Sequence, residues 1–462
     1  MQRRAKIVCT LGPATASPER IRALVDAGMD VARLNFSHGD HETHRAMYQA
    51  VRAASDATGR AVGVLADLQG PKIRLGDFAG GGVTLATGAE FRITTEPVMG
   101  DARRASTTYP GLARDVKPGD RVLVDDGRVR LEVRDTDGRE IVCTVAEGGP
   151  VSDHKGLNLP GAHLAVESVT EKDLADLEFA LSLRVDLVAL SFVRRPEDVT
   201  RVRETLARAQ APLGVLAKIE KPQAVEHLPA ILEAFDGIMV ARGDLGVETP
   251  LERVPMVQKD AIRLARAVAK PVIVATQMLE SMIAHEMPTR AEASDVVNAV
   301  LDGADALMLS GETSVGAHPT AVVETMARLI QAAEDGVRTP PAMRRERPTH
   351  AQGTISRAAV LLATDLGARA VVAPTTRGVT ARFIASYREP VPLLAFTPDP
   401  LVRSQLALTW GCETFVLPET RDTDDLLRQV DQAILASGRG AAGDLVVIAA
   451  GIPLGRAGNT NT

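Results

Sequence analysis

The sequence has few cysteines, few aromatic residues and no long apolar run. Only three of its 462 residues are cysteines, and they are widely spaced at Cys9, Cys143 and Cys412. An odd number of scattered cysteines is typical of reduced thiols rather than of a disulfide framework. No apolar run approaches the roughly 20 residues that a membrane helix needs, and the N-terminal apolar stretch is too short for a signal peptide. We therefore expect a cytoplasmic protein with no membrane partner.

The sequence also has no excess of positive charge, with 53 basic and 59 acidic residues. The formal net charge of -6 provides no basic surface of the kind that binds nucleic acid, so nucleic acid is not an expected partner. Lysine is rarer still, because nine of the 53 basic residues are lysines and the other 44 are arginines. Where arginine is the default cation, a lysine inside a motif indicates a need for a compact ammonium group.

The length of the chain exceeds what one hydrophobic core supports and predicts two to four domains. From Ala5 onward, apolar runs alternate with amphipathic helical stretches. The predicted strands are Ile7–Leu11, Asp30–Phe36, Ala61–Leu68, Val185–Val193, Leu213–Ile219, Gly237–Ala241, Pro271–Ala275 and Ala306–Leu309. Eight strand–helix units favour a (β/α)₈ barrel over residues 1–70 and 154–335. A doubly wound sheet is the alternative, although such sheets usually have fewer strands.

Two further segments differ from the barrel in their sequence pattern. Residues 71–153 contain short alternating strands, with Asp-Asp-Gly at 125–127 and Thr-Asp-Gly at 136–138, which are hairpin signals. They predict a small inserted β-barrel domain that acts as a lid over the catalytic face. Residues 336–349 are rich in proline and arginine and are interpreted as a linker. Residues 350–462 alternate strands and helices again and predict a small open α/β domain.

The strongest chemical signal lies at two neighbouring strand ends. Lys218 and Glu220 end one apolar run, and Arg242, Gly243 and Asp244 follow the next. Side chains alternate along a strand, so Lys218 and Glu220 point the same way. Two carboxylates beside an ammonium suit Mg²⁺ or Mn²⁺, with substrate oxygens completing the coordination shell. A surface Lys/Glu pair and an unrelated turn aspartate remain the alternative.

Other strand ends carry polar residues that are individually weak signals. Arg33 suits capture of a phosphate or carboxylate, or else closes the barrel with an ion pair. Thr276 alone is more typical of a helix cap than of a catalytic residue, and Ser310 and Glu312 share that ambiguity. The remaining candidates are Asn35, Ser37, Asp67, Lys72, Arg74 and Lys155.

The motifs together resemble those of the pyruvate kinase family. The segments are IVCTLGPA, GMDVARLNFSHG, LADLQGPKIR, KGLNLPG, AKIEKP, MVARGDLGVE, PVIVATQMLESM, PTRAEASDVVNAVLDGADALMLSGETSVG and GRAGNTNT. The resemblance implies a TIM barrel with an inserted β domain and a C-terminal α/β domain, usually assembled as a homotetramer. It also implies phosphoryl transfer from phosphoenolpyruvate to ADP, giving pyruvate and ATP.

The resemblance assigns roles to residues at matching positions. Glu220 and Asp244 resemble Mg²⁺ ligands, and Lys218 resembles the lysine that stabilises the transferring phosphoryl group and the enolate. Substrate contacts are implied for Arg33, Lys218, Arg242, Gly243, Asp244 and Thr276, and a proton path for Ser310 and Glu312. Nucleotide contacts are implied for Arg74, His38, Lys155 and Asn35. A monovalent-cation site is implied at Asn35, Ser37, Asp67 and Leu68.

The sequence departs from the family pattern at several places. Many members have Glu where this chain has Lys72, and Leu68 and Gln69 also differ, so we expect K⁺ not to be required. The segment APTTRGVTARF replaces a phosphate-binding loop, and Thr375, Thr376, Arg377, Gly378 and Thr380 still suggest a phosphorylated effector site, with an ordinary capped helix as the alternative. Members usually continue past NTNT with another strand, so we expect a shortened chain or a missing edge strand.

Two other functions remain open at this point. A magnesium-dependent barrel lyase acting on 2-oxo acids also uses a Glu/Asp metal pair, but it gives no reason for the inserted domain. A catalytically silent sensor of phosphometabolites gives no reason for the intact set of Lys218, Glu220, Asp244 and Thr276.

Overall fold

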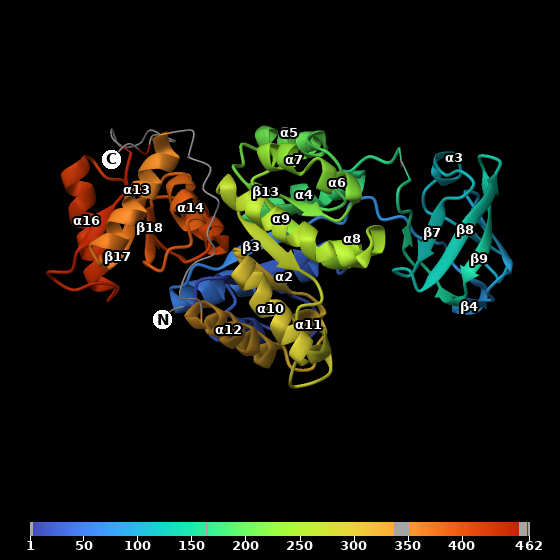
Figure 1. Cartoon of the computed structure of the whole chain (residues 1–462), viewed down its shortest axis with the longest axis horizontal. Helices are drawn as coiled ribbons and strands as arrows, with labels where there is room; N and C mark the ends of the chain where they lie inside the picture. Colours follow the sequence, from blue (N-terminus) through green and yellow to red (C-terminus); the bar gives the residue numbers. More distant parts are fainter. Residues whose placement is uncertain (1–2, 163–164, 337–350, 452–459, 461–462) are drawn as a thin grey trace.

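The computed structural model describes residues 3–162, 165–336, 351–451 and 460, arranged as three bodies in a row. A strand barrel lies in the middle, a β domain at one end and a C-terminal α/β domain at the other (Figure 1). Of the predicted linker, residues 337–349 lie outside the described residues. None of the helices in the described ranges is both long and apolar enough to cross a membrane.

The central body is a closed barrel of eight parallel strands, which confirms the (β/α)₈ prediction over the doubly wound alternative. Their spatial order is β1-β16-β15-β14-β13-β12-β3-β2. The strands are β1 (Lys6–Thr10), β2 (Val31–Asn35), β3 (Gly63–Asp67), β12 (Leu187–Leu190), β13 (Gly214–Ile219), β14 (Gly237–Ala241), β15 (Val272–Ala275) and β16 (Ala306–Leu309). Almost every strand residue is buried, as expected for parallel strands covered on both faces.

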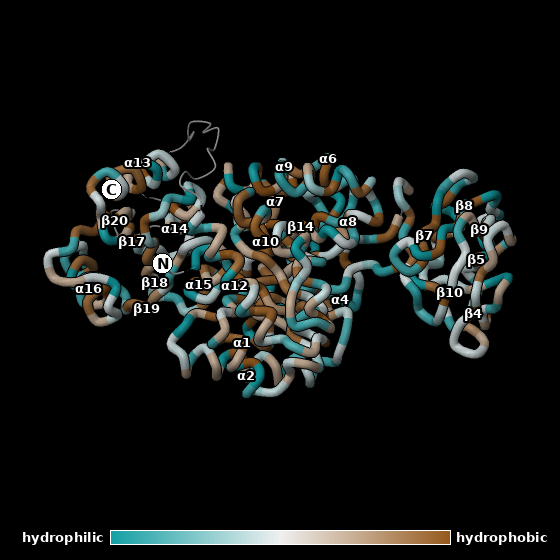
Figure 2. Tube along the Cα trace, turned by 60° about the horizontal axis from the view of Figure 1, so that its bottom comes forward, coloured by the Kyte–Doolittle hydropathy of each residue, from teal (hydrophilic) through white to brown (hydrophobic). Residues whose placement is uncertain are grey.

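Helices surround the barrel and are set by local signals in the sequence. In α1 (Pro18–Ala27), Ser17 caps the start by accepting a hydrogen bond from the Arg20 backbone, and Gly28 ends the helix with a φ of 125°. The other helices are α2 (His41–Thr58), α4 (Glu171–Leu183), α5 (Thr200–Arg208), α6 (Pro222–Glu226), α7 (Leu228–Ala234), α8 (Arg242–Glu248), α9 (Val254–Ala267), α10 (Arg290–Asp302), α11 (Gly311–Ser314) and α12 (Pro319–Gly336). Hydrophobic residues gather in the middle of this body, around β14 and α10 (Figure 2).

The inserted segment forms its own β structure between β3 and β12. A two-stranded sheet pairs β10 with β4, and a six-stranded sheet has the order β11-β7-β8-β9-β5-β6. The elements are β4 (Gly82–Leu85), β5 (Glu90–Thr94), β6 (Arg104–Ser106), α3 (Leu112–Asp115), β7 (Arg121–Val124), β8 (Val129–Thr136), β9 (Glu140–Glu147), β10 (Gly149–Ser152) and β11 (Leu157–Asn158). Both hairpin signals join antiparallel strands, β7 to β8 and β8 to β9.

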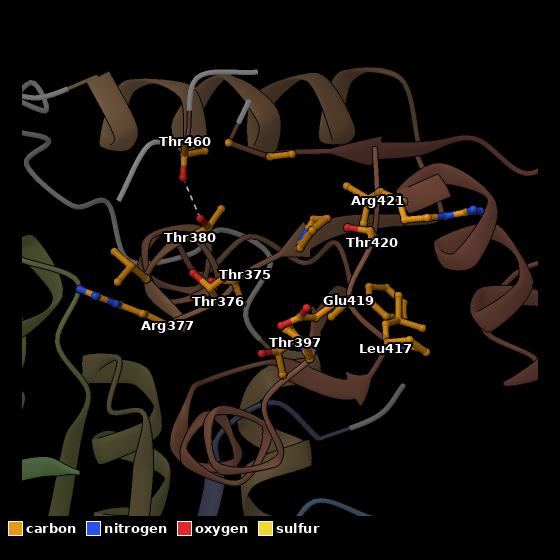
Figure 3. A pocket seen from close by; sticks show the side chains of 18 of the residues that line it. Thr375, Thr376, Arg377, Thr380, Thr397, Leu417, Glu419, Thr420, Arg421 and Thr460 are labelled. Atoms are coloured by element: carbon orange, nitrogen blue, oxygen red, sulfur yellow. Dashed lines mark hydrogen bonds between the residues drawn. The ribbon is translucent and has the colours of Figure 1, made fainter. Parts of the chain in front are cut away.

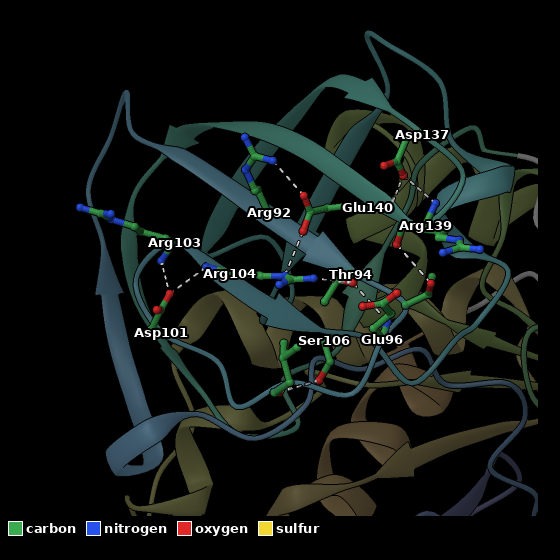
Figure 4. A network of polar contacts seen from close by, with 12 residues as sticks. Arg92, Thr94, Glu96, Asp101, Arg103, Arg104, Ser106, Asp137, Arg139 and Glu140 are labelled. Atoms are coloured by element: carbon green, nitrogen blue, oxygen red, sulfur yellow. Dashed lines mark hydrogen bonds and ion pairs between the residues drawn. The ribbon is translucent and has the colours of Figure 1, made fainter.

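An ion-pair network covers one face of the insert (Figure 4). Glu140 in β9 bridges Arg92 in β5 at 2.8 Å and Arg104 in β6 at 2.9 Å. These side chains are partly exposed, so each pair stabilises the insert by only about 0–1 kcal/mol.

The C-terminal body is an open four-stranded parallel sheet in the order β19-β18-β17-β20. Its elements are α13 (Ala351–Asp365), β17 (Ala370–Pro374), α14 (Val379–Ser386), β18 (Leu393–Thr397), α15 (Pro400–Gln405), β19 (Cys412–Val416), α16 (Thr423–Ala436) and β20 (Val446–Ile448). Short 3₁₀ turns complete the chain at Ala79–Gly81, Pro196–Val199, Leu251–Arg253, Glu280–Ile283 and Leu406–Leu408. Most of the segment after β20 lies outside the described residues, so the expected loss of an edge strand stays a prediction.

Candidate active site

The carboxyl ends of the barrel strands bring the predicted lysine and two carboxylates together. Lys218 lies near the end of β13 and is 9% exposed. Its Nζ lies 2.9 Å from Glu220 Oε1 and 3.3 Å from Asp67 Oδ1, and it donates a hydrogen bond to Ser191 Oγ at 2.7 Å. An almost buried ammonium is therefore held between two buried carboxylates, unlike a surface Lys/Glu pair.

Mutual attraction keeps Lys218 and Asp67 charged, although burial opposes both charges. Burial alone lowers the pKa of Lys218, but the carboxylates of Asp67 and Glu220 outweigh it and raise that pKa above its usual value. Burial raises the pKa of Asp67, yet Lys218 and Arg33 bring it below its ordinary range. The pKa of Glu220 is raised, first by burial and then by the charge of Asp244, against the pull of Lys218. Lys218 is thus an ammonium and Asp67 a carboxylate at neutral pH.

Arg33 adds a second cation to the cluster. Its Nε lies 2.6 Å from Asp67 Oδ2, and its Nη1 donates to Thr10 Oγ1 at 2.9 Å. Asp67 therefore bridges Arg33 and Lys218. The ion pair that was the alternative interpretation of Arg33 exists, and it also aligns the guanidinium beside the ammonium.

A second group surrounds Thr276, directly after β15. Thr276 Oγ1 accepts a hydrogen bond from the backbone N–H of Gly243 at 2.7 Å. The guanidinium of Arg242 donates to the Thr276 carbonyl at 2.7 Å and pairs with Asp295 at 2.7 Å, so that side chain is already engaged. Thr276 has a φ of 70°, a conformation rarely adopted by a β-branched residue and typical of functional sites.

Ser310 and Glu312 follow β16 and lie near the loop that carries Thr276. Glu312 is fully buried, and its carboxylate accepts hydrogen bonds from the backbone N–H groups of Ser310 at 2.6 Å and Leu279 at 3.1 Å. Within the described part of the chain, the buried Ser310 Oγ has no hydrogen-bond partner. A buried hydroxyl without a partner is costly, so this one is available to a ligand or a water molecule.

The carboxylates of Glu220 and Asp244 fit a magnesium ion. Asp244 lies in the first turn of α8, close enough to raise the pKa of Glu220. Among the described residues there is no group of three or more His, Cys, Asp or Glu that could hold a metal. Two oxygen ligands nevertheless match Mg²⁺, which is usually held by one or two carboxylates plus water and substrate phosphates.

The residues predicted to contact the nucleotide do not all lie together. Burial lowers the pKa of His38, and so do the charges of Lys72, Arg74 and Arg33, which therefore lie in one neighbourhood. Lys155 instead pairs with Asp125 inside the insert at 2.9 Å.

At the predicted monovalent-cation site, internal contacts already use several groups. Asn35 Oδ1 accepts from the Ser37 backbone at 3.2 Å, and the Leu68 carbonyl accepts from Ser191 Oγ at 2.7 Å. Together with the ion pairs of Asp67, these contacts occupy an oxygen of three of the four candidate residues.

Sequence reasoning missed the residues that orient the functional side chains. Ser191 holds Lys218, Thr10 holds Arg33, and Asp295 holds Arg242. Ser191 and Thr10 each lie at the C-terminal end of a barrel strand, so the criterion that selected Asp67 and Glu220 would have found them. Asp295 lies within α10 and gave no comparable signal.

The chain is similar to known proteins over its whole length. The model of the pyruvate kinase barrel domain matches residues 2–323, and that of the pyruvate kinase alpha/beta domain matches residues 353–462. The chain belongs to the pyruvate kinase family. Pyruvate kinases of Mycobacterium tuberculosis and Mycobacterium intracellulare are 59% and 60% identical to it over 461 residues, spanning 100% of this chain and 98% of theirs. A pyruvate kinase structure from Cryptosporidium parvum superposes with a TM-score of 0.93 at 35% identity, covering 100% of this chain and 95% of that one.

Membership of the pyruvate kinase family confirms the resemblance found in the sequence. The protein is a glycolytic phosphotransferase, and its substrates are phosphoenolpyruvate and ADP. The family match does not support the alternative of a barrel lyase.

Proposed function

We propose that the cluster of Lys218, Glu220, Asp67 and Arg33 is the phosphoryl-transfer centre and that it works with Mg²⁺. The observation that carries this proposal is the buried Lys218 ammonium, 2.9 Å from Glu220 and 3.3 Å from Asp67. Phosphoryl transfer depends mainly on positioning and on neutralising developing charge. Mg²⁺, or Mn²⁺ in its place, held by Glu220 and Asp244, would polarise the enolate and phosphoryl oxygens.

The site residues bind different parts of phosphoenolpyruvate. Arg33 and Lys218 hold the phosphoryl group, while Thr276 and the backbone around Gly243 hold the carboxylate of phosphoenolpyruvate. The hydroxyl of Ser310, which has no partner among the described residues and whose backbone N–H is held by Glu312, lies on the path that delivers a proton to the enolate.

The insert would close over the site and exclude water from the phosphoryl group. His38, Arg74, Lys155 and Asn35 contact the nucleotide in this proposal. The returning chain is tied to the barrel where Asn158 donates to Glu248 at 3.1 Å, and Lys221 pairs with the same carboxylate at 2.6 Å.

A coupled assay tests the proposed chemistry. Purified protein with phosphoenolpyruvate, ADP and Mg²⁺ is expected to form ATP and pyruvate in equal amounts, and Glu220→Gln is expected to lose activity at limiting Mg²⁺. Full activity of the wild type in the presence of a chelator would contradict the role given to the metal.

The C-terminal domain carries a pocket of ≈ 330 Å³ that we assign to a phosphorylated effector. Thr375, Thr376, Arg377 and Thr380 line it, and Gly378 lies between them at the start of α14 with a φ of 74°. Backbone N–H groups at a helix start and several hydroxyls favour a phosphate. In Figure 3 the side chain of Arg377 extends away from Thr375 and Thr376, so it reaches a bound phosphate by turning inward.

Replacing Arg377 by Ala is expected to weaken the effector response and to leave activity at saturating phosphoenolpyruvate unchanged, because the guanidinium supplies part of the phosphate contact. The measurement is the half-saturation concentration of phosphoenolpyruvate with and without sugar phosphates or AMP. Arg369→Ala, an exposed change outside the pocket, serves as the control. If no phosphometabolite shifts half-saturation in the wild type, the assignment fails.

Two further properties complete the proposal. We expect a homotetramer, as is usual in this family, and sedimentation velocity would contradict it by showing a monomer at assay concentrations. We also expect activity without K⁺, since Lys72 brings a tethered cation to the neighbourhood of Arg33 and His38.

A further inference from the structure

A cluster of buried charges lies where the barrel meets the C-terminal domain, at the opposite end of the barrel from the active site. Arg266 lies in the last turn of α9, and Asp305 immediately precedes β16. Arg382 lies in α14 of the C-terminal domain, and Arg388 follows that helix. Together with Lys270 these residues, the junction cluster, surround a cavity of ≈ 10 Å³.

The junction cluster has more positive than negative charge. Four cationic side chains and one carboxylate line the cavity. The carboxylate of Asp305 has three contacts already, because it lies 2.8 Å from Arg388 Nη2 and accepts from the backbone N–H groups of Trp410 and Val272, both at 3.2 Å. Among the described residues, the ion pair of Asp305 within this cluster is with Arg388 and not with Arg266.

Arg388 forms the internally satisfied half of the cluster. Besides Asp305, its guanidinium donates to the carbonyls of Gly303 at 2.9 Å and Ala385 at 2.7 Å, and it lies over the ring of Trp410 at 5.0 Å. These contacts join the C-terminal domain to the barrel without help from a ligand.

Arg266 forms the unsatisfied half. It is 5% exposed, and its Nε is buried without a hydrogen-bond partner among the described residues. Its guanidinium has one long contact, from Nη2 to the Ser386 carbonyl at 3.5 Å. A Cβ on residue 303 would lie 2.6 Å from Arg266 Nη1, so Gly303 is required for this close packing.

The surroundings penalise the positive charge of Arg266. Burial, and then the neighbouring charge of Arg388, lower the pKa of Arg266 to about 10, against the opposing effect of Asp305. A buried charge without a compensating partner is strongly destabilising. Asp305 compensates the charge of Arg266 only in part, so the cation is retained at a position where its burial is incompletely offset.

The two remaining cations differ in where their charged groups lie. The ammonium of Lys270 donates to the carbonyls of Leu232 and Phe235 near the end of α7. Arg382 donates from Nη2 to the Arg377 carbonyl at 2.9 Å, and burial lowers its pKa while Asp236 partly restores it. Asp236 itself is paired with Arg203 at 2.8 Å.

We propose that the junction cluster is a binding site for a small anion, held between Arg266 and Arg382 with Arg388 behind them. The cavity takes about one particle of the size of water. A water molecule would satisfy the Arg266 Nε but would not neutralise the excess charge. The space as it stands is at the lower limit for one water molecule. A chloride ion, or a tetrahedral phosphate that matches a guanidinium fork, fits once the half-buried Arg382 swings outward.

Bound there, the anion joins the two domains electrostatically. It contacts α9 on the barrel side and α14 on the C-terminal side, so its loss weakens the docking of one domain on the other. This site is separate from the effector pocket, whose lining residues do not include Arg266, Arg388 or Lys270.

Anomalous diffraction with bromide tests the location of the anion. Crystals soaked in sodium bromide at about 0.1 M are expected to show an anomalous peak between Arg266 and Arg382. A second soak that contains both bromide and phosphate shows whether an oxyanion displaces the bromide. A peak displaced by phosphate assigns an oxyanion site, and a peak that persists assigns a halide site. A water molecule at that position, with no anomalous signal, would overturn the proposal.

Thermal unfolding tests whether the anion stabilises the protein in solution. At constant ionic strength, replacing sodium gluconate by chloride or phosphate is expected to raise the Tm by about 1–2 °C for each tenfold rise above the Kd. Arg266→Met is expected to abolish this anion dependence. Arg263→Met, an exposed change one turn earlier on the same helix, is expected to keep it. Equal anion dependence in all three proteins would show non-specific salt effects and contradict the proposal.

Discussion

Replacing Lys218 by Met is expected to lower turnover by at least about a hundredfold while leaving Mg²⁺ affinity within a few fold. The Lys218 ammonium lies within 2.9 Å of Glu220 and 3.3 Å of Asp67, so it can neutralise charge as it develops on the transferring phosphoryl group and the enolate. Removing a cation next to a metal ligand does not weaken electrostatic attraction for Mg²⁺. The loss should therefore appear in turnover and not in metal binding.

The experiment compares steady-state turnover with Mn²⁺ or Mg²⁺ titrations of the same preparations. Lys259→Met provides a matched control, since this lysine lies on helix α9 outside the barrel and pairs with Asp302. Circular dichroism must show that Lys218→Met folds, because the change leaves two buried carboxylates less compensated. Near-normal turnover in a folded Lys218→Met protein would contradict the assignment, as would a large loss of metal affinity.

The second large effect is expected at Lys72. The wild type should reach near-maximal activity in tetramethylammonium buffer with Mg²⁺, and Lys72→Glu should make activity depend on K⁺ by tenfold or more. A unit charge at about 4 Å contributes roughly 4 kcal/mol at an effective dielectric of 20 and nearer 1 kcal/mol in water. Because Lys72 is exposed, the smaller interaction energy applies. About 1 kcal/mol still changes the occupancy of a weak cation site.

The surroundings of Lys72 support this prediction. Its charge, together with those of Arg74 and Arg33, lowers the pKa of His38, although burial is the larger cause. Asp67, which would contribute a carboxylate to a K⁺ site, is already paired with Arg33 and Lys218.

A matched charge change separates the local effect from a general one. Lys117→Glu alters the same net charge at an exposed position of the insert and is expected to leave activity independent of K⁺. Tenfold activation of the wild type by K⁺ would overturn the idea, and so would a Lys72→Glu protein that ignores K⁺.

The sequence predicted those parts of the molecule that depend on local signals. Ser17 and Gly28 bound α1 as expected, and the hairpins after Val124 and Thr136 form where turn residues occur. Lys218 and Glu220 share a face because side chains alternate along a strand. Each of these predictions needs only a few neighbouring residues.

Pairings between distant segments were beyond reach of the sequence. Lys155 pairs with Asp125 because strand β11 returns beside β7, which no spacing reveals. The burial of Arg266 depends on how the C-terminal domain docks against α9 and Gly303. In an arginine-rich chain such a residue is indistinguishable from its exposed neighbours until the domains are assembled.

Strand β16 gives the barrel a direct mechanical connection between its two ends. It begins next to Asp305, which anchors Arg388 of the C-terminal domain, and it ends next to Ser310 in the candidate active site. Five residue steps, about 16 Å of extended chain, separate the two. The strand is buried and bonded on both sides, to β1 and β15, so it resists stretching and bending. A tilt of the C-terminal domain that pulls on Asp305 is therefore expected to shift Ser310 together with the neighbouring strands β1 and β15.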